Sequence, residues 1–202
     1  MTSKNQLLII SSNQTLIEDR SEFVGLKPTI YKFDITLSDL NRQVYDALNL
    51  TIALHPSETI ERMMVRVLAF CMNAQERLMF SKGISAPDEP DIWSHTLDNQ
   101  ISLWIDVGEP AVDRIKKATR QSSAVKIYSF NSKSNAWWKQ GQKHFNGLPV
   151  SVFQFEWKTI QSLATLAQRT LDLSVTISDQ SAYVASKDGE CDVPWVPLQV
   201  IP

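Results

Sequence analysis

The residues best suited to chemistry are two acidic positions on neighbouring strand-like segments. Asp91 closes the run Asp88-Glu89-Pro90-Asp91 and enters one segment, and Asp106 lies near the end of the next. Carboxylates on adjacent strands can converge on one hard divalent ion, Mg²⁺ or Mn²⁺. Such an ion polarises a phosphodiester and lowers the pKa of a bound water. The pair therefore indicates metal-dependent phosphodiester chemistry, although acidic residues at strand ends also serve as turn formers or caps.

A third carboxylate for this site is expected from a helix that precedes the two strands. His55-Pro56 ends an earlier strand, and Ser57 is suited to cap the helix that follows. Glu58 and Glu61 fall in the first helical turn, where they complement the helix dipole. Apolar residues recur behind them at helical spacing: Ile60, Met63, Met64, Val67, Leu68 and Cys71. Glu58 or Glu61 would then complete the metal site.

The order of the remaining elements predicts the fold class. Residues 31–37 and 44–54 alternate between apolar and polar, which indicates an N-terminal hairpin, and residues 173–177 and 182–185 indicate a C-terminal one. Between the hairpins, strands are expected at residues 78–84, 92–97, 101–107, 124–130 and 150–156, and helices at 112–118, 134–145 and 160–167. This order is typical of an α/β (α+β) domain with a mixed central sheet flanked by helices.

The length and composition are those of one globular domain. The chain has 202 residues, of which 43% are hydrophobic, and this is enough for one sizeable core but not for two. Residues 1–26 are polar and poor in aromatics, so they are expected to form a weakly ordered N-terminal extension, in which residues 7–10 favour a short strand. Residues 27–202 are expected to form the single domain.

The sequence predicts a cytoplasmic protein without a membrane segment. The longest apolar run near the N-terminus covers residues 7–10, which is too short for a signal peptide. No stretch approaches the length of about 20 apolar residues that spans a bilayer. Cys71 and Cys191 form neither a disulfide framework nor a zinc-binding pattern. A monomer is the default expectation for the oligomeric state.

Charge is unevenly distributed along a chain whose net charge is only −2. Residues 56–110 contain nine Asp or Glu and four Lys or Arg, a net charge of −5, whereas residues 111–145 contain eight Lys or Arg and one Asp, a net charge of +7. Solvated helix faces would explain this difference. An acidic metal pocket beside a basic wall for a nucleic-acid substrate would explain it as well.

Several residues are candidates for contact with a substrate or a metal. Trp137-Trp138 lies beside Lys139 and could stack bases against the basic wall. Two adjacent helical residues cannot face the same way, so at least one of these rings is expected in the core. Arg114 lies in the same basic segment, and with Trp137 and Lys139 it makes up the candidate substrate-binding set. His95, between the two acidic positions, is a further candidate ligand.

Blocks of sequence from about residue 27 onward resemble the signature blocks of the YaeQ family, in the family's order. They are Tyr31-Lys32-Phe33, His55-Pro56-Ser57-Glu58-Thr59, Glu61-Arg62-Met63-Met64, Asp88-Glu89-Pro90-Asp91-Ile92-Trp93, Leu103-Trp104-Ile105-Asp106-Val107-Gly108, Arg114-Ile115-Lys116-Lys117-Ala118, Tyr128-Ser129-Phe130-Asn131-Ser132 and Trp137-Trp138. The resemblance implies a variant of the PD-(D/E)XK, restriction-endonuclease-like fold, to which the two hairpins are additions.

The resemblance also assigns roles within the acidic site. Carried over by position, Pro90-Asp91 is the PD element and Asp106 is the acidic residue that follows it. The lysine of the motif would stand two residues later, where this sequence has Gly108. The motif is therefore incomplete, and Lys116 or Lys117 on the next helix would have to reach back into the site.

Two functions are compatible with these residues. The first is a nuclease-like phosphodiesterase that uses Mg²⁺ or Mn²⁺ and acts on nucleic acid. The second is a catalytically inactive module that keeps the fold and binds nucleic acid or protein; the glycine at position 108 and the modest net charge favour it. A purely structural role for both carboxylates is a third alternative.

Overall fold

The computed structural model describes residues 27–81 and 88–201. The predictions of a weakly ordered extension at residues 1–26 and of a strand at residues 7–10 lie outside the described residues. So does the second half of the strand predicted at residues 78–84. No helix in the described part of the chain is long and apolar enough to cross a membrane.

The strands of the described chain form one mixed sheet. Along the chain they are β1 (Thr29–Asp39), β2 (Val44–Leu54), β3 (Leu78–Phe80), β4 (Ile92–His95), β5 (Ile101–Val107), β6 (Ser122–Ser129), β7 (Val150–Phe155), β8 (Thr170–Ser178), β9 (Ser181–Ser186) and β10 (Gly189–Gln199). In space their order is β2-β1-β8-β9-β10-β7-β6-β5-β4-β3. The predicted hairpins are confirmed as the antiparallel pairs β1–β2 and β8–β9.

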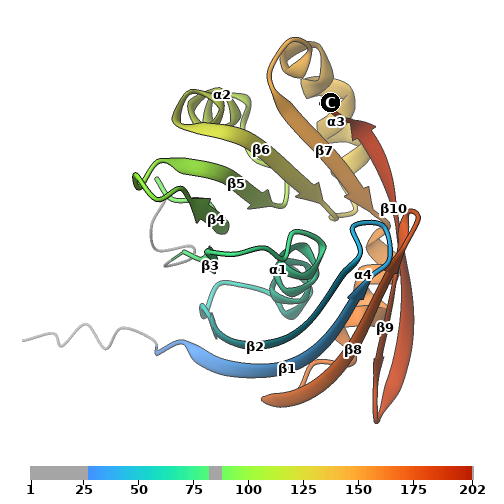
Figure 1. Ribbon diagram of the computed structural model, residues 1–202. Coiled ribbons are helices and arrows are strands. Elements are labelled where there is room, and N and C mark those ends of the chain that lie inside the picture. The colour runs from blue at the N-terminus through green and yellow to red at the C-terminus, as the bar shows by residue number, and fades with distance from the viewer. Residues whose placement is uncertain (1–26, 82–87, 202) are drawn as a thin grey trace, which may run out of the picture.

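The long strand β10 joins two halves of this sheet. Its residues up to Pro194 pair with β9, and from Trp195 onward they pair with β7. Figure 1 shows β10 running along the side of the molecule where the sheet bends from one half to the other. The sequence did not predict this strand, because proline cannot donate to a sheet ladder. Here Pro194 lies where the pairing partner changes, and Pro197 borders an irregularity in the β7 pairing.

The four helices of the described chain flank the sheet on both sides (Figure 1). Inside its curve lie α1 (Ile60–Met72) and α4 (Trp157–Ala164), which contact each other and contribute to the larger hydrophobic core. On the outer face of β5, β6 and β7 lie α2 (Val112–Gln121) and α3 (Ser134–Phe145), which cover a smaller core. The fold is therefore mixed α+β, with a large mixed sheet flanked by helices.

Helix α1 is held in the centre of the molecule by an almost entirely buried surface. All nine residues from Met63 to Cys71 are buried. The prediction that Ser57 caps this helix is wrong: the N-cap is Thr59, whose side chain accepts a hydrogen bond from the Arg62 amide. Ser57 is used in a local turn instead, where its hydroxyl lies 2.7 Å from Nδ1 of His55.

Helix α3 is attached to the sheet by a compact aromatic group. Trp137 and Trp138 both lie beside Phe145, with ring centroids 5.4 and 5.6 Å from it. Phe145 is fully buried, and Gly141 lies one helical turn before it. A Cβ atom at position 141 would come within 2.8 Å of Cζ of Phe145. The glycine is therefore needed because the phenylalanine ring occupies the space beside the helix.

Replacing Gly141 with alanine should lower the free energy of unfolding by about 1–2 kcal/mol, because overpacking outweighs the gain in helix propensity. Chemical denaturation of the wild type and the variant measures this change. The exposed neighbour Gln140 provides the control, since Gln140→Ala should change stability by less than about 0.5 kcal/mol. Equal stability of the Gly141 variant and the wild type would contradict this packing argument.

Candidate functional site

Asp91 connects the start of β4 to the end of β5 and to α1. Its backbone amide donates to the Ile105 carbonyl over 2.9 Å. Its carboxylate accepts a 2.7 Å bond from the Val107 amide and a 2.6 Å bond from Nη2 of Arg62. Nε of Arg66 lies 3.8 Å from the same carboxylate. Only 6% of Asp91 is exposed, so these partners replace water around a buried charge.

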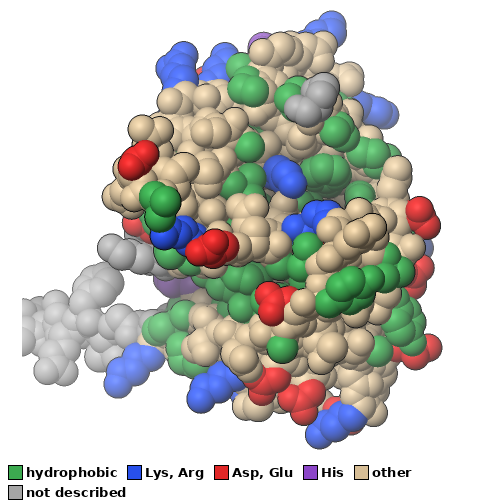
Figure 2. Space-filling view, in the orientation of Figure 1, with side chains coloured by type: hydrophobic (Ala, Val, Ile, Leu, Met, Phe, Trp, Pro, Cys, Tyr) green, Lys and Arg blue, Asp and Glu red, His purple; other side chains and the backbone are tan. Residues whose placement is uncertain are grey.

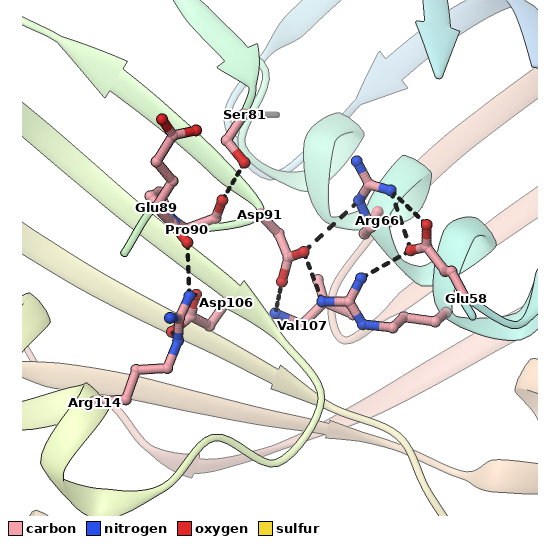
Figure 3. A network of polar contacts seen from close by, with 10 residues as sticks. Glu58, Arg66, Ser81, Glu89, Pro90, Asp91, Asp106, Val107 and Arg114 are labelled. Atoms are coloured by element: carbon pink, nitrogen blue, oxygen red, sulfur yellow. Dashed lines mark hydrogen bonds and ion pairs between the residues drawn. The ribbon is translucent and has the colours of Figure 1, made fainter. Parts of the chain in front are cut away.

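Glu58 binds the same two arginines as Asp91, and Figure 3 shows its contact with Arg66. It accepts a 2.8 Å bond from Nη1 of Arg62 and bonds of 3.0 and 3.1 Å from Nη1 of Arg66. Arg62 therefore bridges Glu58 and Asp91. Arg66 is 2% exposed and lies between the same two carboxylates. The helix and the strand entry are held together by this cluster of four charges.

Asp106 is bound by α2 and not by α1. Side chains along β5 point alternately to the two faces of the sheet, so Asp106 points the same way as Trp104, two residues earlier. Trp104 packs into the outer core, under α2. Arg114 of α2 binds both carboxylate oxygens of Asp106, each over 2.8 Å, and also donates a 2.7 Å bond to the Glu89 carbonyl. Burial raises the pKa of the Asp106 carboxyl, and the bonds from Arg114 oppose that effect. Asp91 and Asp106 thus lie near each other but have separate partners.

The carboxylate oxygens of these acids, which would be the metal ligands, already accept hydrogen bonds from arginines. Three carboxylates, Glu58, Asp91 and Asp106, are matched by three guanidinium groups, Arg62, Arg66 and Arg114. Across residues 27–81 and 88–201, no three His, Cys, Asp or Glu side chains are grouped so that they could hold a metal ion. A Mg²⁺ or Mn²⁺ ion would have to displace arginines to reach oxygen ligands, so the residues present do not fit it in this arrangement. Binding of a metal ion at this site stays a prediction.

Gly108, where the sequence resemblance led us to expect a lysine, has an unusual backbone conformation. Gly108 has a φ of +110°, and its amide donates a 2.9 Å bond to the Tyr128 carbonyl. Residues with a side chain rarely adopt this conformation, and glycine adopts it without strain. A lysine could therefore occupy this position only at a cost in backbone free energy or with a change in the end of β5.

The other predicted catalytic and metal residues lie outside this cluster of charges. Lys117 is exposed and forms an ion pair with Asp88. Lys116 is half-buried on α2, and Glu61 is half-buried in the first turn of α1. His95 packs against Trp93, with the ring centroids 4.7 Å apart. None of these side chains takes part in the contacts that hold Asp91 and Asp106.

The three residues predicted to bind a substrate do not lie together. Arg114 is bound to Asp106. Trp137 is partly buried in the aromatic group of α3, and its Nε1 donates a 3.0 Å bond to the Pro110 carbonyl, so its ring is fixed as a support of that helix. Lys139 is exposed on the same helix. The structure therefore brings Arg114 to Asp106 but leaves Trp137 and Lys139 away from the acidic residues.

Sequence reasoning missed the arginines that bind the acids. Arg62 and Arg66 follow Glu58 by four and eight residues, so all three can lie on one side of a helix. Arg66 also falls inside the apolar stripe, between Met64 and Val67, where a charge must be paired. Another missed residue is Glu109, which accepts bonds from the amides of Phe130 and Asn131 and from the Ser134 hydroxyl, at the start of α3.

Comparison with known proteins identifies the family. A family model described as YaeQ protein matches residues 24–195. The chain belongs to the YaeQ family. An uncharacterized protein YaeQ of Escherichia coli K12 is 38% identical over 172 residues, which cover 84% of this chain and 95% of that protein. One of Salmonella typhi is 39% identical over the same length and coverage.

Two solved YaeQ structures resemble this chain over most of its length. The crystal structure of the YaeQ protein from Xanthomonas axonopodis pv. citri has a TM-score of 0.84 and 31% identity, and the match covers 86% of this chain and 99% of that one. The YaeQ structure from Pseudomonas syringae has a TM-score of 0.82 and 33% identity, with coverage of 86% and 97%. The family resemblance read from the sequence is therefore confirmed.

Replacing Asp91 with alanine should destabilise the protein by about 3–5 kcal/mol, because it leaves Arg62 and Arg66 without one of their partners. Denaturation followed by tryptophan fluorescence measures the loss. Asp91→Asn keeps an oxygen for the Val107 amide and should lose less. The control is Glu61→Ala, in the first turn of α1 but outside the cluster, which should change stability by less than about 0.5 kcal/mol. A stable Asp91→Ala protein would show that the cluster is not structural.

Proposed function

We propose that the chain is a nucleic-acid-binding module with a restriction-endonuclease-like core whose acidic residues stabilise the fold and no longer catalyse. The observation that carries this proposal is the pairing of three acids of the predicted site, Glu58, Asp91 and Asp106, with arginines. Gly108 adds to it, because the lysine of the motif is replaced by a residue in a conformation that lysine disfavours.

The connectivity of the elements supports the proposed core. Along the chain, α1 is followed by β3, β4 and β5, then by α2 and β6. The pairs β3–β4 and β4–β5 are antiparallel, and the pair β5–β6 is parallel. This is the helix–strand–strand–strand–helix–strand order that the family resemblance implies for the PD-(D/E)XK fold. In this core Asp91 and Asp106 stand at the positions of the motif's acids.

A basic surface supports nucleic acid as the partner. Helices α2 and α3 contact each other on the outer face of the sheet. We call six basic residues of α2, of α3 and of the N-cap of α3 the α2–α3 basic face; they are Lys116, Lys117, Arg120, Lys133, Lys139 and Lys143. Figure 2 shows several Lys and Arg side chains projecting from the upper part of the molecule, where these helices lie. Such a face attracts phosphates even though the net charge of the chain is −2.

The basic face can be tested by removing part of its charge. Replacing Lys133, Lys139 and Lys143 with alanine should weaken binding of DNA or RNA about ten-fold or more at low salt, because each lost phosphate contact removes counterion release. Fluorescence anisotropy with labelled single-stranded and duplex oligonucleotides at several salt concentrations measures this. The matched control replaces Lys32, Lys158 and Lys187, three exposed lysines on other parts of the molecule. Equal losses in both variants, or no binding by the wild type, would contradict the proposal.

The absence of catalysis has its own test. Gly108→Lys, which restores the lysine of the motif, should lower stability by about 1–3 kcal/mol and create no cleavage of DNA or RNA in Mg²⁺ or Mn²⁺. Gly108→Ala is the control, because it introduces the same backbone strain without an ammonium group. A difference between the two variants then reports the effect of the ammonium group alone. Thermal unfolding and gel assays of end-labelled DNA and RNA are the measurements.

A different result would favour the metal-dependent phosphodiesterase. Cleavage by the wild type that requires a divalent ion and disappears in both Asp91→Asn and Asp106→Asn would overturn the inactive-module proposal. A rise in the unfolding temperature of the wild type with Mn²⁺ that the same two variants lack would point the same way, because an ion that binds only the folded state stabilises it.

A further inference from the structure

A hollow of about 610 Å³ lies outside the charged cluster, on the outer face of the β4–β5 pair. Its floor includes Trp93 and Ile101, and the end of α2 and the start of β6 form one wall. We call it the Trp93 hollow; it is lined by Asp88, Trp93, Asn99, Gln100, Ile101, Trp104, Arg120, Gln121, Ser122 and Ser123. Its size is that of a site for one small organic molecule and is far too small for a duplex.

The floor of the hollow is aromatic. Trp93 lies directly opposite Trp104 in the antiparallel β4–β5 pair. Trp104 is almost fully buried, but Trp93 is partly exposed to the hollow. The Nε1–H of Trp93 is buried and meets no acceptor among the described residues. A ligand in the hollow would therefore meet the exposed part of the Trp93 ring and not this nitrogen.

The rim combines the cation Arg120 with amides and hydroxyls, and its one acid, Asp88, forms an ion pair with Lys117. Arg120 supplies the charge, and Asn99, Gln100, Gln121 and Ser123 are exposed groups that can both donate and accept hydrogen bonds. An apolar ligand would leave these groups unpaired, and a simple anion would not use the aromatic floor. A planar ring with polar edges and an attached anion satisfies both parts of the lining.

A second hollow of about 390 Å³ continues from the first under α2. It shares Asp88 and Trp104 with the Trp93 hollow and is also lined by Arg114 and Lys117. Arg120 and Lys117 both belong to the α2–α3 basic face, so phosphates that follow this face pass the rim of the hollow. The aromatic floor is thus placed beside the surface that attracts a nucleic-acid backbone.

We infer that the Trp93 hollow holds one nucleotide unit, with its base against Trp93 and its phosphate at Arg120. The unit can belong to a single strand bound along the basic face, and in that form the inference rests on the proposed function. It can also be a free mononucleotide, and in that form it does not. In both forms a duplex is excluded, because paired and stacked bases cannot enter the hollow.

The test compares binding of three probes to matched variants. Trp93→Ala should weaken binding of a short single-stranded oligonucleotide about ten-fold, which is the loss of one stacked base, and leave duplex binding unchanged. Arg120→Ala and Ser123→Glu, both at exposed positions, should weaken the same probe without any risk to the core. Gln140→Ala, exposed on α3 away from the hollow, is the control. Anisotropy with the oligonucleotide and the duplex, and calorimetry with adenosine and uridine monophosphates, are the measurements.

The outcomes separate the two proposals. Single-strand binding that all three hollow variants weaken supports both. Mononucleotide binding that these variants weaken, without binding of any polymer, keeps the hollow and overturns the proposed function. Polymer binding that none of the three variants changes keeps the proposed function and overturns the nucleotide site. No binding of any probe by the wild type overturns both.

Discussion

Arg62 donates one hydrogen bond to Glu58 and another to Asp91, and in this way it joins α1 to the entry of β4. The carboxylate of Asp91 in turn accepts from the Val107 amide, so one side chain fixes α1, the entry to β4 and the end of β5. A buried charge is costly unless it is paired, and here each charge has a partner. The same pairing occupies the carboxylate oxygens that a divalent ion would need, so an ion could bind there only by displacing an arginine.

The elements that sequence periodicity specifies were predicted well. Alternation over residues 31–37 and 44–54 predicted the first hairpin, and the apolar spacing from Ile60 to Cys71 predicted α1, because side-chain direction in regular structure depends only on position along the chain. The exceptions have local causes. Thr59 and not Ser57 caps α1, since Ser57 is engaged by His55, and β10 was missed because Pro194 and Pro197 stand where its ladder changes.

The candidate site was predicted less well, because its chemistry depends on contacts across the fold. The positions of Asp91 and Asp106 at strand ends followed from the sequence. Which arginine each of them binds did not, since Arg114 comes from another helix and reaches Asp106 only when α2 packs on the outer face. The Trp93 hollow is likewise made by strands and a helix that are separate in the sequence, and no local pattern marks it.

The change of partner along β10 affects how the chain can fold. Its first residues complete the half of the sheet that contains the β1–β2 hairpin, and its last residues complete the half that contains β5, β6 and β7. In chain order β10 comes after every other strand of the described residues. The hydrogen-bonded sheet therefore cannot be continuous between its two halves until this last strand is in place. Assembly of the sheet is then dominated by contacts between residues distant in the sequence, which is the condition for slow, cooperative folding.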